Sequence, residues 1–401
     1  MDCRISTETL RLLDNNQGLE HNPLPNEVKP AMEKKEKLLS QEEEPPPLFD
    51  EKDNSASYDC IKDFIGFKDF KKVTARYPFV TTAYYLSLAQ NAPDDPIIKQ
   101  LCPSIEELRS SVGETEDPLE EEIASPVPGL VHRYPDRALM IVTNVCFMNC
   151  RHCTRKRLWK KHRFTRTLSE IGKMIDYIKD NKQIRDVILS GGDPLTLPLG
   201  DLEIILERLR RIRHLEVIRI GTRAPVVFPQ RITPWLAMIL KRYRPLWLNT
   251  QFNHPHEITP QSAAAISLLQ DSGVVVNNQS VLLKGVNDNA QTMTRLCHGL
   301  LKIGVRPYYL FHCDPVEGVG HFRTPISKGL EIIEQLRGHT SGLAVPTFVV
   351  DAVRGGGKIP LQPDYLVSKN NGVVILRNYK HECFVYSDEP EVKLSENRHN
   401  L

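Results

Sequence analysis

The chain has 401 residues, of which 40% are hydrophobic and 25% charged, and its 52 basic and 50 acidic side chains leave a formal net charge of only +2. This balance excludes a protein that wraps a polyanion through bulk charge, because binding by counterion release needs a concentrated excess of Lys and Arg. No stretch approaches the roughly 18 apolar residues of a membrane span. The N-terminus carries early acids and lacks the apolar core of a secretory signal, so we expect a soluble protein without a membrane partner.

Residues 1–57 differ in composition from the rest of the chain. The run SQEEEPPPLFDEKDNSAS is acidic and proline-rich, with too few large apolar side chains to bury a core. We therefore expect a disordered or linker-like extension over 1–57. From 58 to 130 the apolar residues follow a punctuated helical period, which predicts a helical N-terminal region.

The middle of the chain alternates short β-branched runs with helical runs. The predicted strands are 138–143, 186–190, 218–223, 246–252, 274–280 and 306–312. Near-continuously apolar strands separated by helices pair in parallel through right-handed crossovers. The sequence therefore predicts an α/β fold whose core, over 131–351, is a partial (βα)6 barrel; an open doubly wound sheet is the alternative. Beyond it, GVVILRNY and ECFVYS alternate like antiparallel strands, which predicts a small C-terminal cap with a flexible tail over 352–401.

Three of the nine cysteines, Cys146, Cys150 and Cys153, crowd into the segment directly after the first predicted strand. An odd number of cysteines in a chain of this length favours metal binding or catalysis over a disulfide framework. Three thiolates leave one iron of a [4Fe–4S] cube without a protein ligand, so that this iron can bind another molecule. A structural zinc is the alternative, but zinc takes four protein ligands and the remaining cysteines are scattered singly.

The Cys-x3-Cys-x2-Cys motif resembles the fingerprint of radical S-adenosylmethionine (SAM) enzymes, in which the open iron chelates SAM. The segments SPVPGLVHRYPDR, VILSGGDPL, RIGTRAPVVFPQRIT and PTFVVDAVRGGGKIP resemble the lysine 2,3-aminomutase family, and the similarity covers about three quarters of the chain. The resemblance implies a radical SAM barrel and a pyridoxal phosphate (PLP)-dependent isomerase. Such an enzyme interconverts L-lysine and β-lysine by 1,2-amino migration, through an external aldimine and a 5′-deoxyadenosyl radical.

The resemblance also implies roles for individual residues. Lys358 matches the lysine that forms the Schiff base with PLP, a reaction that needs the neutral amine. The residues that match its PLP contacts are Arg133, Tyr134 and Arg137, whose guanidinium groups suit a phosphate. The cluster ligands are implied to be Cys146, Cys150 and Cys153. The implied SAM contacts are Ser190, Gly191, Gly192, Asp193 and Gln279.

Three further residues match the family's substrate contacts. Arg155 matches the arginine that grips the α-carboxylate, and Asp314 and Asp351 match the acids that hold the distal ammonium. Relatives that act on glutamate carry a lysine and an asparagine at those two positions. Two aspartates would repel an acidic side chain, so the pattern favours L-lysine. The alternative is a related radical SAM aminomutase that acts on glutamate or on a protein-bound lysine.

Taken singly, these residues have ordinary interpretations, such as a strand-to-helix turn for the Gly-Gly-Asp loop or a surface loop for Lys358. Their placement argues otherwise, because they follow the carboxyl ends of predicted strands, where the catalytic groups of βα barrels gather. Residues 151–166 are strongly basic, but they overlap the cysteine motif and their flanks are neutral, so we expect no nucleic-acid partner.

The sequence departs from the family pattern at a few positions. Gln251 stands where the resemblance implies His. Asn289 replaces one member of a zinc-binding cysteine set and leaves Cys383 alone, so we expect no structural zinc. The resemblance further implies a homo-oligomer and an electron donor such as flavodoxin or ferredoxin, and an exposed cluster iron implies a reducing cytoplasm.

Overall fold

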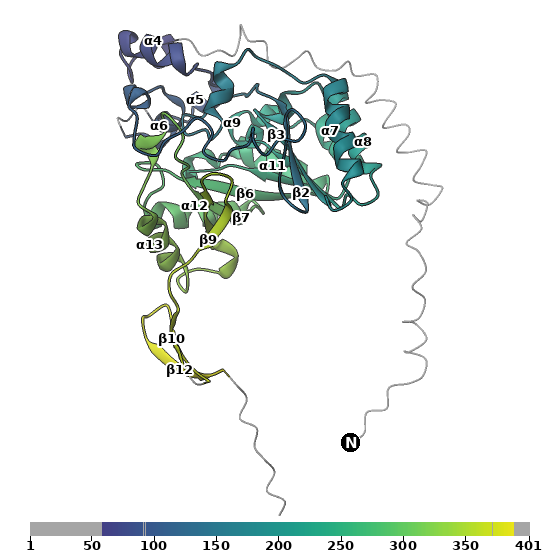
Figure 1. Cartoon of the computed structure of the whole chain (residues 1–401). Coiled ribbons are helices and arrows are strands. Elements are labelled where there is room, and N and C mark those ends of the chain that lie inside the picture. The colour runs from purple at the N-terminus through teal and green to yellow at the C-terminus, as the bar shows by residue number, and fades with distance from the viewer. Residues whose placement is uncertain (1–57, 91, 93, 371, 389–401) are drawn as a thin grey trace, which may run out of the picture. The chain divides into compact units, whose positions relative to one another are not determined.

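A computed structural model describes residues 58–90, 92, 94–370 and 372–388 of the chain. The predicted extension over 1–57 and the end of the predicted C-terminal tail lie outside these residues. The described residues form a nine-stranded sheet in the order β1 to β9 and a three-stranded sheet of β10, β11 and β12 (Figure 1).

Seven neighbouring strands of the large sheet run parallel to one another. They are β2 (Arg137–Thr143), β3 (Asp186–Gly191), β4 (Val217–Gly221), β5 (Leu246–Thr250), β6 (Val274–Leu282), β7 (Arg306–His312) and β8 (Thr347–Ala352). The six predicted strands are β2 to β7, and the predicted α/β barrel fold is confirmed. The strand β8 extends the parallel set by one, and it adds no further βα unit because a hairpin follows it instead of a helix.

Helices connect the parallel strands and cover the outer face of the sheet (Figure 1). They are α7 (Leu168–Asp180), α8 (Leu199–Arg210), α9 (Ala224–Val227), α10 (Pro234–Arg242), α11 (Pro260–Asp271), α12 (Ala290–Lys302) and α13 (Ile326–Leu336). The helix α7 begins with a capping box in which Thr167 and Glu170 bond each other's backbone N–H groups. Its buried face runs from Ile171 to Ile178, as the apolar period predicts.

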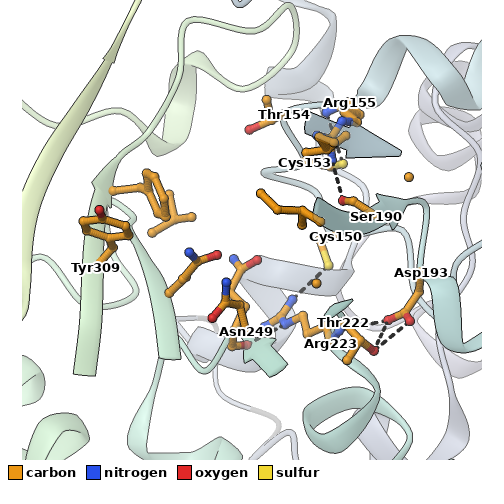
Figure 2. A pocket seen from close by; sticks show the side chains of 18 of the residues that line it. Cys150, Cys153, Thr154, Arg155, Ser190, Asp193, Thr222, Arg223, Asn249 and Tyr309 are labelled. Carbon is orange, nitrogen blue, oxygen red and sulfur yellow. Dashed lines mark hydrogen bonds between the residues drawn. The ribbon is translucent and has the colours of Figure 1, made fainter. Parts of the chain in front are cut away.

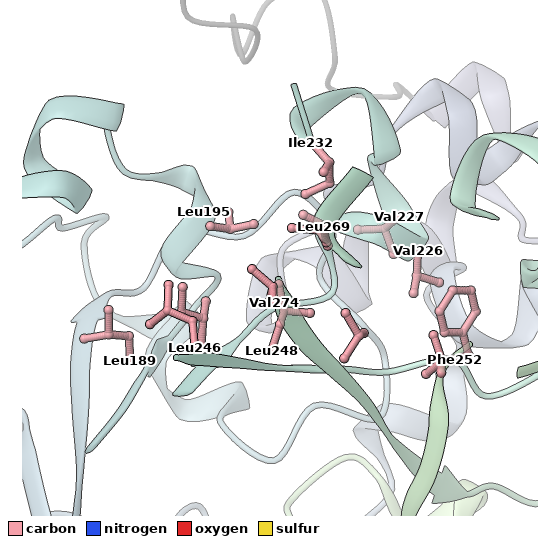
Figure 3. Close-up of a cluster of buried hydrophobic side chains, with 14 of the residues drawn as sticks. Leu189, Leu195, Val226, Val227, Ile232, Leu246, Leu248, Phe252, Leu269 and Val274 are labelled. Atoms are coloured by element: carbon pink, nitrogen blue, oxygen red, sulfur yellow. The ribbon is translucent and has the colours of Figure 1, made fainter. Parts of the chain in front are cut away.

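The core lies between the outer face of the sheet and these helices. Alternate residues of a strand point to opposite faces, so one set packs outward while the next set faces the barrel interior. The outward set and the helices bury apolar side chains against one another, among them Leu189, Leu246, Leu248, Val226 and Leu269 (Figure 3). The inward set includes the polar residues Ser190, Arg219 and Asn249. The barrel interior is therefore not filled by an apolar core and can hold a site.

The N-terminal region contains helices as far as Leu108, whereas the sequence analysis expects a helical region as far as residue 130. Its helices are η1 (Tyr58–Cys60), α4 (Phe67–Arg76), α5 (Ala83–Leu86), α6 (Pro96–Leu101) and η2 (Ile105–Leu108). Residues 109–129 then cross to the barrel without a helix or strand, and Thr115 pairs with the backbone beside Val316, after β7. The short strand β1 (Leu130–Tyr134) follows and joins β2 in antiparallel orientation. Further 3-10 turns are η3 (Lys156–Lys160), η4 (Pro194–Thr196), η5 (Pro229–Arg231), η6 (Pro255–Glu257), η7 (Gly320–Phe322) and η8 (Gly342–Ala344).

The C-terminal region is made of antiparallel strands. The strand β9 (Gly357–Leu361) pairs with β8, and β10 (Leu366–Asn370), β11 (Val373–Arg377) and β12 (Cys383–Ser387) form the small sheet. The antiparallel strands predicted from GVVILRNY and ECFVYS correspond to β11 and β12. The strand β9 was not predicted, because its glycine-rich start indicates a loop. Gly355 and Gly357, at φ 71° and 84°, instead make the hairpin turn that leads into β9.

Candidate active site

The barrel interior holds a cavity of about 560 Å³, a size typical of small-molecule sites. The structure brings every predicted site residue to the wall of this one cavity. These residues are Arg133, Tyr134, Arg137, Cys146, Cys150, Cys153, Arg155, Ser190, Gly191, Gly192, Asp193, Gln279, Asp314, Asp351 and Lys358. Residues spread over more than half of the chain thus meet in one place.

The three cysteines lie on the loop that follows β2, here called the cluster loop (residues 144–155). All three are half-buried and line the cavity, and Figure 2 shows Cys150 and Cys153. Burial, reinforced by the neighbouring Cys150 sulfur, raises the pKa of Cys153 to about 11. Burial also raises the pKa of Cys146 well above its usual value. Thiols of this kind become thiolates when metal ions bind them, so the donor set fits an iron–sulfur cluster.

The arrangement of these sulfurs differs from that of a site for one ion. Among the described residues, no three His, Cys, Asp or Glu side chains are grouped closely enough to hold a single metal ion. A [4Fe–4S] cube binds each cysteine through a different iron, so it needs its thiolates farther apart than the ligands of one ion. The spread of Cys146, Cys150 and Cys153 around the cavity wall suits the larger group.

The Gly-Gly-Asp loop after β3 packs directly against the start of the cluster loop. A Cβ atom would lie 2.2 Å from the Thr143 carbonyl oxygen at Gly191 and 2.1 Å from the Val145 carbonyl oxygen at Gly192. The backbone N–H groups of Gly192 and Asp193 donate to the same two carbonyls, at 2.6 Å and 2.7 Å. Glycine is required here because the two backbones touch.

Asp193 lines the cavity, but its carboxylate is held by the protein. Its oxygens accept hydrogen bonds from the Thr222 hydroxyl at 2.7 Å and 2.9 Å (Figure 2). They also accept from the backbone N–H groups of Leu195 and Arg223 at 3.0 Å and 2.9 Å. Burial raises its pKa, and these donors oppose that shift. The Asp193 carboxylate therefore holds the backbone at Thr222 and Arg223 in place, a structural role that is separate from the SAM contact expected of it.

Arg223 is a site residue that the sequence analysis missed. Its Nη1 donates to the Cys150 sulfur at 2.9 Å, and its Nη2 donates to Glu257 at 2.6 Å and to Gln100 at 2.7 Å. Burial alone would lower its pKa, but the Cys150 sulfur and the groups around it outweigh burial and raise it. A permanent cation thus lies against the sulfur of Cys150, one of the three cysteines expected to bind the cluster. Its position just beyond the end of β4 is the one signal in the sequence that could have singled it out.

Gln251, one of the positions at which the sequence departs from the family pattern, also lines the cavity. Its amide nitrogen lies 2.8 Å from Nε2 of His152, a buried residue of the cluster loop. Burial lowers the pKa of His152 well below its usual value, so this imidazole is neutral. Gln251 therefore contacts the cluster loop through the side chain of His152. Gln279 reaches the same cavity from β6.

The implied PLP contacts gather where β1, β2 and β9 meet. The backbone N–H of Lys358 donates to the Tyr134 hydroxyl at 2.8 Å, and the Arg137 guanidinium lies 4.4 Å from the Tyr134 ring centre. Arg133 donates to the Leu119 carbonyl, yet its Nε is buried and has no hydrogen-bond partner within the described residues. A buried cationic donor without a partner, next to a lysine and a tyrosine, fits the phosphate and aldehyde groups of PLP.

The two aspartates expected to bind the substrate ammonium lie on neighbouring strand ends. Asp351 is paired with Lys358, whose Nζ lies 2.9 Å and 3.0 Å from its two oxygens. Asp314, after β7, accepts a hydrogen bond from the Thr154 hydroxyl at 2.8 Å. Burial raises the pKa of Asp314 to about 6; the Thr154 bond opposes this rise and the Asp351 charge adds to it. Without the Lys358 charge, the two carboxylates would give this part of the cavity an acidic character that suits a cationic side chain.

Arg155 is held by a residue that the sequence analysis also missed. Its Nε and Nη2 donate to the carboxylate of Glu121, with Nη2 at 2.7 Å from Oε1, and its Nη1 donates to the Ser190 hydroxyl at 3.2 Å (Figure 2 shows the bond to Ser190). Burial opposes ionisation of Glu121, but the charges of Arg155 and Arg157 outweigh it and lower its pKa to about 2. The guanidinium is thus anchored on one edge and directed to the cavity on the other.

Two family models match the chain. Residues 140–297 match the Radical SAM superfamily, and residues 333–400 match the family described as Lysine-2,3-aminomutase. Together with the barrel and the three cysteines at the end of β2, these matches define the chain as a radical SAM enzyme.

Similar curated proteins narrow the family. The L-lysine 2,3-aminomutase of Clostridium subterminale is 54% identical over 308 residues, which cover 77% of this chain and 74% of that enzyme. The L-lysine 2,3-aminomutase of Bacillus subtilis is 53% identical over 79% of this chain and 68% of that enzyme. The glutamate 2,3-aminomutase of Clostridioides difficile is 44% identical over 81% of this chain and 77% of that enzyme. The chain belongs to the lysine 2,3-aminomutase family, a family of isomerases whose cofactors are a [4Fe–4S] cluster, SAM and PLP, as its sequence predicts.

In the part of the chain that the structure describes, no helix combines the length and the apolar character needed to cross a membrane.

Proposed function

We propose that this chain interconverts L-lysine and β-lysine by exchanging the α-amino group with a hydrogen on C3. The observation that carries the proposal is the acidic pair Asp314 and Asp351, which lines the same cavity as the cluster loop and Arg155. Two carboxylates favour a substrate with a cationic side chain and repel glutamate. The higher identity to the lysine-acting relatives, at 54% against 44% for the glutamate enzyme, agrees with this electrostatic argument.

The residues that line the cavity fall into three sets, according to the cofactor that each set suits. We assign the cluster to Cys146, Cys150 and Cys153. We assign PLP to Lys358, Arg133, Tyr134 and Arg137, and SAM to Ser190, Gly191, Gly192, Asp193 and Gln279. When bound, the cluster and SAM supply a carbon radical that can remove hydrogen from C3, and PLP supplies a C=N bond that lets the amino group migrate. The protein contributes placement and exclusion of water.

The substrate is bound at its two ends in this proposal. Arg155 binds the α-carboxylate through a guanidinium fork, and Asp314 and Asp351 bind the distal ammonium. Holding both ends fixes the position of C3 along the cavity. An enzyme that must control a radical intermediate needs such placement, because a small misplacement of the reacting carbon costs much of the rate.

One experiment tests the proposed reaction. The full chain is purified anaerobically, reconstituted with iron, sulfide, PLP and SAM, reduced, and offered L-lysine, L-glutamate and a lysine-containing peptide separately. We expect β-lysine from L-lysine and no product from the other two. Formation of β-glutamate, or modification of the peptide alone, would assign the cavity to one of the alternative substrates. Asp314→Lys should abolish β-lysine formation, whereas an enzyme for an acidic substrate would tolerate it.

We further propose that the protein works in the reducing cytoplasm as a homo-oligomer and takes electrons from flavodoxin or ferredoxin. The small sheet of β10, β11 and β12 supports association, because it exposes Leu366, Phe384, Val385 and Tyr386 to solvent at 53% or more. Sedimentation of the holoenzyme should give a mass above that of one chain, and Val385→Asp should lower it. Metal analysis of the same sample should find iron and no zinc.

A further inference from the structure

The residue that holds Arg155 comes from outside the barrel. Glu121 lies on the crossing segment 109–129, which leads from the N-terminal helices to β1, and it is 34 positions from Arg155. Its carboxylate binds Nε of Arg155 at 2.9 Å through Oε2 and Nη2 at 2.7 Å through Oε1. This is a side-on, bidentate ion pair, the most directional pairing available to a guanidinium.

The hydrogen-bond inventory of Arg155 shows which edge remains for a ligand. A guanidinium has five N–H groups. Two of them, on Nε and Nη2, donate to Glu121, and one on Nη1 donates to the Ser190 hydroxyl at 3.2 Å. One N–H on Nη1 and one on Nη2 remain. They form the end-on edge of the fork when Ser190 accepts the Nη1 hydrogen that points toward Cδ. That edge has the spacing of a carboxylate, and Arg155 lines the cavity.

Glu121 is itself fixed in position. Its Oε2 accepts a second hydrogen bond from Nη2 of the buried Arg157 at 2.8 Å, and Arg157 also lies 3.4 Å from Asp117 on the same crossing segment. The side chain of Glu121 is 5% exposed, so water does not compete for its oxygens. A carboxylate clamped in this way leaves the Arg155 side chain little freedom to turn.

We infer that Glu121 is a positioning residue that aims the end-on edge of Arg155 at the α-carboxylate of the substrate. This inference rests on the proposed function, in which Arg155 binds that carboxylate. Without Glu121, the long Arg155 side chain would have to be ordered by the substrate itself, and the entropy lost in doing so would weaken binding. The lost charge of Glu121 acts in the opposite direction, because it makes the neighbourhood of Arg155 more attractive to an anion.

A comparison of two ligands distinguishes the orientation of Arg155 from two other effects of the substitution, which are the lost charge of Glu121 and a general loss of stability. L-lysine and L-lysinamide share the amino groups and the side chain, but lysinamide lacks the carboxylate. Binding of each is measured by calorimetry to the oxidised holoenzyme, which does not turn over without a reductant. The wild-type protein should prefer lysine, and Glu121→Gln should weaken lysine binding by about 10- to 100-fold, the range expected for hydrogen bonds to a charged group, while lysinamide binding stays unchanged.

The matched control is the neighbouring glutamate. The Glu122 side chain is 63% exposed and pairs with Lys161 at 2.9 Å, so Glu122→Gln should leave both affinities unchanged. Iron content, PLP content and the melting temperature establish that each variant is folded. If Glu121→Gln does not fold, Glu121→Asp takes its place. This variant keeps the charge but draws the carboxylate back by one methylene, and it should lose part of the preference for lysine.

The outcomes are distinct. A loss of the lysine preference in the Glu121 variant, together with a raised KM for lysine, supports the inference. An unchanged preference, tighter lysine binding, or an equal loss for both ligands overturns it while the proposed function stands. The α-carboxylate is common to all α-amino acids. If the wild-type protein makes no β-lysine, the proposed reaction fails separately, and the same comparison is made with the amino acid that it does use and the amide of that acid.

Discussion

Asp351 and Lys358 stand directly opposite each other in the β8–β9 ladder, and the ammonium of Lys358 lies 2.9 Å and 3.0 Å from the two oxygens of Asp351. The lysine assigned to PLP and one acid assigned to the substrate therefore neutralise each other. If Lys358 holds PLP as we propose, its ammonium would no longer neutralise Asp351, and Asp351 could then bind another ammonium. The glycine-rich turn that joins β8 to β9 sets the register of the ladder and with it this pairing.

Replacing Lys358 tests its assignment. Lys358→Ala should abolish β-lysine formation and remove the absorbance of protein-bound PLP, because no other amine stands at that place in the ladder. The iron–sulfur absorbance should be unchanged, since the cysteines assigned to the cluster lie on a different loop. Lys369→Ala, which removes an exposed lysine of β10 paired with Asp388, is the control and should retain full activity. Unchanged β-lysine formation by Lys358→Ala would exclude the Schiff-base role.

The raised pKa of Asp314 predicts how activity depends on pH. The carboxylate binds an ammonium only when it is ionised, and in the free protein its pKa is about 6. Since kcat/KM reports the ionisation of free enzyme, kcat/KM for lysine should fall as the pH drops through about 6 and approach a tenfold loss per pH unit below it. Asp314→Asn should lower kcat/KM at neutral pH and abolish this acidic limb. A variant that keeps the same limb would show that another group titrates.

The contact between the Gly-Gly-Asp loop and the cluster loop predicts that an alanine at Gly192 destabilises the protein. Gly192→Ala places a methyl group 2.1 Å from the Val145 carbonyl oxygen, so the cluster loop must shift. Overpacking of this kind destabilises proteins by about 1–3 kcal/mol, and we expect poor iron loading as well.

Gly200→Ala is the control for this substitution. Gly200 lies in α8 with no atom within 4 Å of an added Cβ, and alanine should stabilise the helix by about 0.5–1 kcal/mol. Denaturant unfolding and iron content measure both variants. Equal stability and equal iron content of the two would contradict the tight contact.

Arg223 should influence the cluster itself. Hydrogen bonds and positive charge at a ligand sulfur raise the reduction potential of an iron–sulfur cluster, because they favour the more negative reduced state. Arg223→Gln removes the cation that lies 2.9 Å from the Cys150 sulfur, so the midpoint potential should fall. It also removes the ion-pair partner of the buried Glu257, a change that costs about 3–5 kcal/mol in other proteins.

A redox titration followed by electron paramagnetic resonance measures the potential of the Arg223 variant. Arg242→Gln serves as the control, because it breaks an exposed pair with Glu203 and should change stability by less than about 1 kcal/mol and leave the potential where it is. If Arg223→Gln retains its cluster at the wild-type potential, the sulfur contact has no influence on redox behaviour.

The features that could be predicted from the sequence are those that depend on residues close together along the chain. The helix α7 has a capping box and an apolar stripe, and the three cysteines have a fixed spacing within one loop. The missed features depend on contacts between distant segments. Glu121 and Arg155 are 34 positions apart, and Cys150 and Arg223 are 73 apart, so no local period connects them. The strand β9 was missed for the same reason, because its hydrogen bonds to β8, rather than its own composition, make it a strand.

The large sheet ends in two edge strands, β1 and β9, and within the described residues no strand ladder joins them. A hydrogen bond from the backbone N–H of Lys358 in β9 to the hydroxyl of Tyr134 in β1 links these two edges, between residues 224 positions apart. A molecule bound by Arg133 on one edge strand and by Lys358 on the other, as we propose for PLP, would hold the two edges together. Occupancy of that site and closure of the barrel would then be thermodynamically linked, so PLP bound as proposed would also tie the first strand of the sheet to the last.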